Sequence, residues 1–237
     1  MKFDRLKMTE ALRRAVQRMH YPLEVMLVCV RRYMAYPLSL RHLEEMMAER
    51  GVAVDHSTIH RWAIKTLPVL AAVCRRRKRP VGGSWRMDEI YVKVGGPWKY
   101  LYRAVNRNGH TVDFLLRAKR DHAAAWAFFE RAIDLHGVPK KITIDKSGAN
   151  TAAIVSVQAD SGLPIELRQS KYLNNIVEQD HRAVKRITRP MLGFKSFRYA
   201  RILIAGIETM HMIRKGQLGD IKDRASSAAS QFYSLAF

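Results

Sequence analysis

The feature that most constrains the fold is the placement of two aspartates on short apolar strands. Residues 85–94 (WRMDEIYVKV) alternate as a β-strand does, and counting by twos puts Asp88 on the apolar side. Asp145 ends a second strand, residues 141–145, just before a cluster of turn-forming residues. A carboxylate on the core side of a strand is costly unless it is paired, protonated or bound to a metal ion. The pattern therefore favours a functional role for both acids.

A third acid, Glu178, opens a helical stretch rich in basic residues. His181, Arg182 and Lys185 lie three, four and seven positions further on, which puts them on one helical face with Glu178. Two strand acids and one helix acid supply the carboxylate oxygens that Mg²⁺ prefers. Taken singly, each acid also fits a structural role, as the partner of a basic residue, the start of a turn or half of a surface pair. Taken together, the three predict a divalent metal site.

The charge balance of the chain points to a polyanionic partner. The 237 residues include 42 Lys and Arg against 21 Asp and Glu, a net charge of +21. Nucleic acid is the commonest such partner, and the basic residues are spread too widely for one membrane-binding segment. The two cysteines, Cys29 and Cys74, offer no Cys/His zinc spacing and no disulfide framework, and no apolar run reaches membrane-spanning length. We expect a soluble protein of the cytoplasm.

The N-terminal residues 1–80 are expected to be helical and to bind DNA. Ser39 and Asp55 are candidate caps of two short helices separated by Gly51, which is the helix-turn-helix pattern, over residues 38–66. In that motif the second helix enters the major groove of DNA. An ordinary pair of packed helices is the alternative. The candidate base contacts are His56, Ser57, Thr58, His60, Arg61 and Lys65.

A run of basic residues follows and is expected to form a linker along DNA phosphates. It ends at Pro80 and precedes two glycines, which is typical of an interdomain segment. Phosphate contacts position a protein on DNA without carrying sequence information. The candidate phosphate contacts are Arg75, Arg76, Arg77, Lys78 and Arg79, together with Arg182 and Arg186 of the Glu178 helix.

Residues 81–216 are expected to form a mixed β-sheet flanked by helices, and residues 217–237 a loosely held tail. Three strands joined by tight turns precede a helix, a fourth strand, a short helix or loop, a weak fifth strand and further helices. This order, with acids on the first and fourth strands, resembles the ribonuclease H-like fold, in which those two strands are neighbours. The fold class is therefore α+β, with an all-α helix-turn-helix domain followed by a ribonuclease H-like domain.

Several sequence blocks resemble a known family. They include residues 55–62 (DHSTIHRW), 87–94 (MDEIYVKV), 144–146 (IDK), 171–186 (KYLNNIVEQDHRAVKR) and 192–195 (LGFK). The blocks are similar to those of the DDE transposases of bacterial insertion sequences, of the IS-six (IS-twenty-six-like) type. The resemblance implies that Asp88, Asp145 and Glu178 are the catalytic, metal-binding triad and that Lys185 is the lysine that accompanies it.

The resemblance also implies an activity and its partners. The enzyme would bind the terminal inverted repeats of its element and cut and join double-stranded DNA, including target DNA. It would use Mg²⁺, with Mn²⁺ as a possible substitute, and act as a homodimer or higher oligomer. Two alternatives stay open, a DNA-binding regulator without catalysis and a nuclease that cleaves without joining. Two Glu-x-x-His pairs, at Glu178 and Glu208, match di-iron bundles, but the predicted sheet disfavours that fold.

Overall fold

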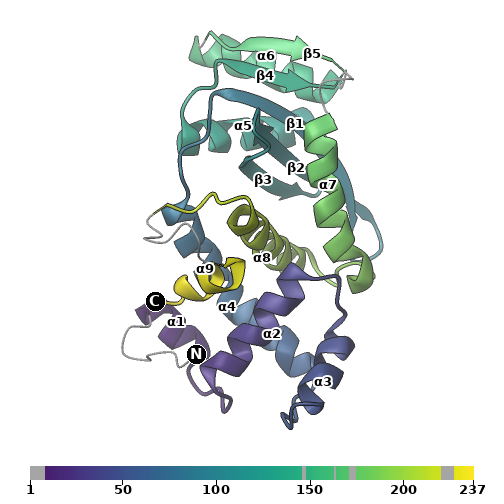
Figure 1. The fold of residues 1–237 in the computed structure, drawn as a ribbon. Helices are drawn as coiled ribbons and strands as arrows, with labels where there is room; N and C mark the ends of the chain where they lie inside the picture. The colour runs from purple at the N-terminus through teal and green to yellow at the C-terminus, as the bar shows by residue number, and fades with distance from the viewer. Residues whose placement is uncertain (1–8, 146–147, 163, 171–174, 220–226) are drawn as a thin grey trace. The chain divides into compact units, whose positions relative to one another are not determined.

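The chain divides into two compact units. The computed structural model describes residues 9–145, 148–162, 164–170, 175–219 and 227–237 (Figure 1). Unit 1 comprises Met1–Arg79 and Val184–Phe237, and unit 2 comprises Pro80–Ala183. The sequence suggested one boundary near residue 80 and a single domain over 81–216. The structure instead groups the residues from Val184 onward with the N-terminal helices.

Unit 1 is helical. Its central pair is α4 and α8, and α2 packs against both. At Gly206 of α8, a Cβ atom would lie 2.6 Å from Met34 Sδ and 2.7 Å from Leu67 Cδ2. The glycine therefore permits the three helices to approach closely. The helices of unit 1 are α1 (Glu10–Val16), α2 (Leu23–Ala35), α3 (Leu40–Ala48), α4 (His56–Arg77), α8 (Phe197–Arg214) and α9 (Ala228–Ser234), with a 3₁₀ turn at Arg189–Met191.

The second helix of the predicted helix-turn-helix is longer than expected. The sequence indicated a short helix over residues 56–65, but α4 runs for 22 residues, to Arg77, and contains Pro68. Pro68 is exposed, whereas Leu67, Leu70 and Cys74 are buried on the other side. Packing of this apolar side outweighs the backbone hydrogen bond that the proline removes.

The C-terminal segment is not a loose tail where the structure describes it. Its helix α9 packs against α8, and Phe232 and Leu235 are fully buried. Ser227 caps this helix by accepting a hydrogen bond from the Ser230 amide. Most residues of this stretch are small or polar, which is why it was predicted to be loosely held. Its two large apolar side chains, Phe232 and Leu235, are nevertheless buried.

Unit 2 is built on a five-stranded mixed sheet. The strand order is β3-β2-β1-β4-β5; β1 to β3 are antiparallel, and β4 and β5 run parallel to β1. This order confirms the predicted ribonuclease H-like arrangement, with the first and fourth strands as neighbours. The strands are β1 (Ser84–Lys93), β2 (Trp98–Asn106), β3 (Thr111–Arg117), β4 (Lys141–Ile144) and β5 (Glu166–Gln169).

Helices cover both faces of this sheet. On one face, α5 (His122–His136) and α6 (Gly148–Ser161) enclose a core that includes Met87 and Tyr102 of the central strands. Asp88 and Arg103 point to the opposite face, where residues of α7 (Asn175–Thr188) contact them. The first turns of α7 therefore lie against the sheet face that carries Asp88 (Figure 1).

A buried ion pair fastens α7 to the sheet. Arg103 Nη2 lies 2.7 Å from Asp180 Oδ2, and the side chains are 0% and 6% exposed. Arg103 sits directly opposite Asp88 on the neighbouring strand. A guanidinium buried beside the sheet centre needs an anion, and Asp180 supplies it. The pair thus fixes which residues of α7 lie over Asp88.

Both cysteines are buried and free, and burial raises the pKa of the Cys29 and Cys74 thiols to about 11. Among the described helices, none is long and apolar enough to cross a membrane.

We predict that breaking the Arg103–Asp180 pair is far more costly than removing it. Asp180→Leu leaves Arg103 charged and buried, so the free energy of unfolding should fall by about 3–5 kcal/mol. The double variant Arg103→Met/Asp180→Leu should recover most of that loss in urea denaturation. Lys141→Gln, which breaks the exposed Lys141–Glu166 pair, is the control and should cost less than about 1 kcal/mol. Equal losses in the single and double variants would contradict the argument.

Candidate active site

The pairing of β1 with β4 brings the two strand acids side by side. The strands run parallel, with Trp85 opposite Ile142 and Arg86 opposite Thr143. Extending that register by two residues puts Asp88 opposite Asp145. The two carboxylates are separated by 56 positions in sequence (145 − 88 − 1), yet the sheet makes them neighbours.

Helix α7 contributes the third acid from above the sheet. Its buried residues recur with helical spacing at Val177, Asp180, His181 and Val184, whereas Glu178 is exposed. His181 was predicted to share the Glu178 face, but it is only 4% exposed, and its Nδ1 lies 3.5 Å from Asp88 Oδ2. The histidine thus belongs to the buried side and contacts the first acid of the triad.

Asp145 and Glu178 are both close enough to Asp88 for their charges to act on it. Burial, opposed by the hydrogen bond from the Glu89 amide and assisted by the negative charges of Glu89, Asp145 and Glu178, raises the pKa of Asp88 to about 7. That amide donates a 2.8 Å hydrogen bond to Asp88 Oδ1. A carboxyl that is partly desolvated and surrounded by other carboxylates is the usual state of a cation site without its cation.

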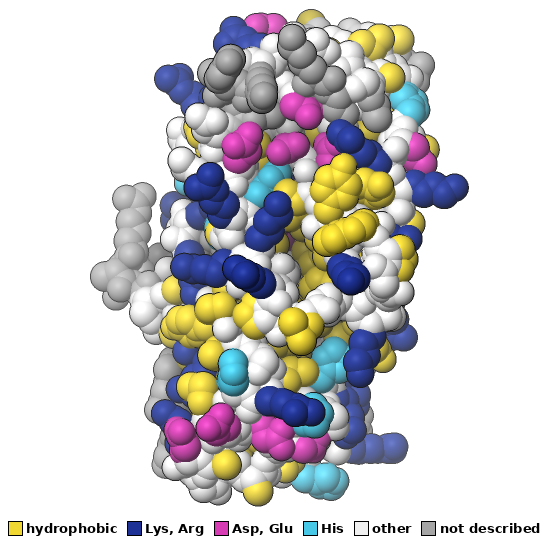
Figure 2. Space-filling model, turned by 90° about the vertical axis from the view of Figure 1, so that its right-hand side faces the viewer, with side chains coloured by type: hydrophobic (Ala, Val, Ile, Leu, Met, Phe, Trp, Pro, Cys, Tyr) yellow, Lys and Arg dark blue, Asp and Glu magenta, His cyan; other side chains and the backbone are white. Residues whose placement is uncertain are grey.

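The donor chemistry fits a divalent metal ion. Asp88, Asp145 and Glu178 offer only carboxylate oxygens, the ligands of hard cations such as Mg²⁺. Within the described residues, no three His, Cys, Asp or Glu side chains stand close enough to enclose an ion as they are. Figure 2 shows acidic side chains gathered on one face of unit 2 with Lys and Arg around them.

Glu89 is a buried acid behind this site, on the other face of β1, that was not among the predicted residues. It is 8% exposed and forms an ion pair with Arg120 Nε. Asn150 Nδ2 donates a 2.8 Å hydrogen bond to Glu89 Oε2. Asn150 was interpreted as a turn former, but it lies fully buried in α6. The adjacent acids Asp88 and Glu89 point to opposite faces of the sheet, and two consecutive acids on a strand were the available signal.

The N-terminus of α4 is occupied by its own cap. The Asp55 carboxylate accepts hydrogen bonds from the amides and hydroxyls of Ser57 and Thr58, which lowers the Asp55 pKa. His56 Nδ1 lies 3.0 Å from Glu44 Oε2 of α3. Three of the six predicted base contacts, His56, Ser57 and Thr58, are therefore engaged within the motif in this structure.

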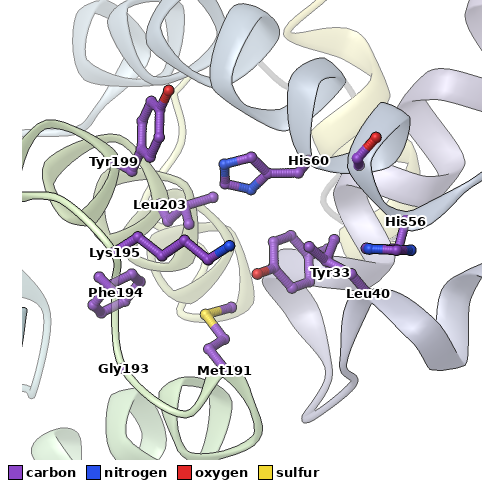
Figure 3. A pocket seen from close by; sticks show the side chains of 11 residues that line it. Tyr33, Leu40, His56, His60, Met191, Gly193, Phe194, Lys195, Tyr199 and Leu203 are labelled. Carbon is purple, nitrogen blue, oxygen red and sulfur yellow. The ribbon is translucent and has the colours of Figure 1, made fainter. Parts of the chain in front are cut away.

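His60 was predicted to lie on the exposed face of its helix, but the structure has it half-buried. It lines a pocket of about 320 Å³ within unit 1, where its ring meets Tyr199 edge to face at 5.2 Å (Figure 3). Burial and the charge of Lys195 lower the His60 pKa. Arg61 and Lys65 are exposed, as predicted for residues that reach DNA.

The basic run is not a free linker. Arg75, Arg76 and Arg77 form the last turn of α4, and the segment after it pairs with residues 217–219. The Arg79 amide donates to the Gln217 carbonyl at 2.8 Å, and Arg77 Nη1 donates to the Ser234 carbonyl at 2.9 Å. Its most exposed members are Arg75, Arg76 and Arg79. On α7, Arg182, Lys185 and Arg186 are all exposed.

The strand order places unit 2 among proteins with the ribonuclease H-like fold, and comparison with known proteins identifies the family. Residues 82–217 match the family model described as a DDE domain. The transposase for insertion sequence-like element IS431mec of Staphylococcus aureus is 39% identical over 194 residues, which cover 81% of this chain and 85% of that protein. The transposase of IS257 in transposon Tn4003, also of Staphylococcus aureus, is 38% identical over the same shares.

The chain belongs to the DDE transposases of the IS-six family. Enzymes of this family are polynucleotidyl transferases that act on DNA with a divalent metal ion. The solved structures that resemble the chain are more distant. The HTLV-2 integrase catalytic core domain with magnesium, in its trimeric form, is 14% identical with a TM-score of 0.45 over 67% of this chain and all of that one. The catalytic core of BIV integrase is 15% identical with a TM-score of 0.43, over 65% and 93% of the two chains.

We predict that Asp88 makes the metal-free protein less stable as the pH rises. Its folded-state pKa of about 7 exceeds the ordinary value of 3.8, so the folded protein holds a proton that the unfolded chain releases. Stability should therefore fall between about pH 4 and pH 7 because of this group.

Urea denaturation in EDTA across that range checks this prediction. In Asp88→Asn, the free energy of unfolding should lack this part of the dependence on pH. At pH 8 it should exceed the free energy of unfolding of the wild type by up to about 4 kcal/mol. Asp134→Asn, at an exposed acid of α5, is the control and should leave the slope unchanged. A wild type as stable as Asp88→Asn at pH 8 would contradict the assigned environment.

Proposed function

We propose that this transposase binds the terminal inverted repeats of its insertion sequence through α3 and α4 and catalyses DNA strand cleavage and transfer at Asp88, Asp145 and Glu178. The observation that supports this most strongly is the parallel register of β1 and β4, which when extended puts Asp88 opposite Asp145, with His181 of α7 against Asp88. The charges of Asp145 and Glu178 also raise the pKa of Asp88, so both acids act on it. A structural role would not require them to be near one another.

The proposed metal is Mg²⁺, with Mn²⁺ as a substitute. When bound, the metal activates a water or a 3′-hydroxyl and stabilises the leaving oxygen at phosphorus. The protein side chains hold the carboxylates in place. The Glu89 amide and His181 orient Asp88, and the Arg103–Asp180 pair holds Glu178 above it.

Exposed cations of α7 are proposed to hold the DNA beside this site. Arg182, Lys185 and Arg186 lie on the solvent side of the helix that carries Glu178. Lys185 follows Glu178 by two helical turns, so both share one face. A cation there would contact a phosphate next to the reacting one. Because an element has two ends, we propose a homodimer in which each copy acts on one end, in the bacterial nucleoid.

We predict that Asp88→Asn and Glu178→Gln abolish strand transfer but retain DNA binding. The lost charges serve the metal and not the phosphates, and several kcal/mol of transition-state stabilisation corresponds to about a thousand-fold or more in rate. The measurement is transfer of a labelled inverted-repeat end with Mg²⁺, beside gel-shift titrations on the same DNA.

Glu166→Gln, at an exposed acid of β5, is the matched control and should stay active. Loss of binding to the same extent as activity would favour the regulator without catalysis. Cleavage without joining in the wild type would favour the nuclease.

We predict that Arg61 carries sequence discrimination and that His60 does not. Arg61→Ala should lower affinity for inverted-repeat DNA by roughly 5- to 150-fold while random DNA is affected much less. His60→Ala removes a pocket-lining side chain and should act on folding stability. Replacing Arg75, Arg76 and Arg79 by Gln should weaken both DNAs equally and reduce the salt slope by about 1 per lost phosphate contact. Binding titrations on both DNAs at several salt concentrations measure these effects. If Arg61→Ala lowers the affinity for both DNAs equally, the helix-turn-helix assignment is wrong.

A further inference from the structure

Three aromatic side chains form an exposed patch on the β1–β2 hairpin of unit 2. Tyr91 is 51% exposed and Trp98 is 59% exposed, while Tyr100 is half-buried. The Tyr91 ring centroid lies 6.5 Å from that of Trp98 and 5.3 Å from that of Tyr100. Large aromatic side chains are normally anchors of a core or of an interface. We call these three residues the hairpin aromatic patch.

The patch lies on the sheet face that α5 and α6 cover further along the strands. Tyr91 stands two and four positions beyond Glu89 and Met87, and strand residues alternate between faces. Met87 is buried under those helices, whereas the strands continue past them and leave Tyr91 uncovered. The opposite face of the same strand end is apolar and buried, at Ile90 and Val92. The exposed aromatics are therefore additional to the core.

The charges around the patch are positive. The strand register puts Lys93 opposite Trp98 and Arg117 opposite Tyr100, so both share the face of the patch. Arg120 interacts electrostatically with Tyr91 and also with Asp145 of the proposed triad. On the face shown in Figure 2, hydrophobic and basic side chains lie beside the group of acids. Arg120 thus connects the patch to the proposed active site.

Flat aromatic side chains surrounded by cations suit single-stranded DNA better than duplex DNA. Unpaired bases stack on tyrosine and tryptophan rings, and their phosphates bind Lys and Arg. A duplex hides the faces of its bases and offers only phosphates and groove edges. A second copy of this chain, also strongly basic, would be repelled by these cations.

We propose that the hairpin aromatic patch binds unpaired bases of a DNA strand next to the active site, with Lys93, Arg117 and Arg120 on its phosphates. The inference rests on the DNA strand cleavage and transfer proposed above, since that chemistry handles strand ends. The bases adjoining the cut would stack on Trp98 and Tyr91, which would hold the strand end near Asp145.

The test is binding of the full chain to DNA in EDTA, where no chemistry occurs. The probes are a fluorescein-labelled oligothymidine of about 12 nucleotides, within the usual site size for such surfaces, and a duplex of the same length. Trp98→Ala should weaken binding of the single strand by roughly 5- to 150-fold, the range for one stacked base, and change duplex binding by less than about twofold. Leu192→Ala, at a side chain that is 92% exposed, is the matched control and should alter neither.

Two further variants keep the test decisive if Trp98→Ala fails to fold. Trp98→Phe keeps an aromatic ring and should retain most of the single-strand affinity. Trp62 and Trp85 are buried and Trp126 is partly buried against the core, so quenching of tryptophan fluorescence by oligothymidine should come mainly from Trp98 and should fall sharply in Trp98→Phe. Lys93→Gln/Arg117→Gln should reduce the salt dependence of single-strand binding.

Several outcomes would overturn the proposal. Equal losses on single strand and duplex in Trp98→Ala would make the patch a general DNA contact. If Trp98→Ala binds the single strand as the wild type does but has a smaller sedimentation coefficient, the patch would be an interface between copies of the chain. Asp88→Asn should bind the oligothymidine as the wild type does. Failure of the proposed chemistry would therefore leave this binding intact, and it can be distinguished from failure of the proposed single-strand site.

Discussion

The proposed active site depends on one buried ion pair, between Arg103 of β2 and Asp180 of α7. Each charge lowers the cost of burying the other, because desolvation of an ion without an opposite charge beside it is expensive. The pair therefore admits only arrangements in which α7 lies across the sheet with Asp180 over β2. Glu178 and His181 belong to the same helical turn, so their positions follow from that constraint.

The local charge pattern around Asp88 opposes stability in the absence of a cation. Burial and three neighbouring carboxylates raise its pKa to about 7, so the protein at neutral pH carries an acid that is poorly solvated and repelled. Compensation comes from nearby groups that are not acids. Arg120 and Asn150 hold Glu89 on the other face of the strand, and His181 contacts Asp88 directly. This balance suits a site that is completed by a cation, because binding removes the repulsion that the fold tolerates.

The sheet and its acids could be predicted from the sequence, since alternation of apolar residues on short strands is a local signal. It was harder to predict whether a given helical residue lies on the buried or the exposed side of its helix. His181 was grouped with Glu178 by spacing alone, but Val177, Asp180 and Val184 define the buried side of α7 and include it. His60 is a similar case, because the residues that enclose it come from distant parts of the chain, such as Tyr199. Patterns within one helix carry no information on such partners.

Neighbouring residues of β1 point to opposite faces of the sheet, so residues that support the fold and residues proposed to act in function lie on different faces. Asp88 and Glu89 are adjacent, yet one faces the proposed metal site and the other is held by α6 and Arg120. Tyr91 continues the Glu89 face beyond the helices that cover it, and Ile90 continues the buried Asp88 face. A strand longer than its covering helices thus exposes aromatic residues without opening the core. The same alternation that buries the supporting residues places the hairpin aromatic patch where a DNA strand could reach the acids.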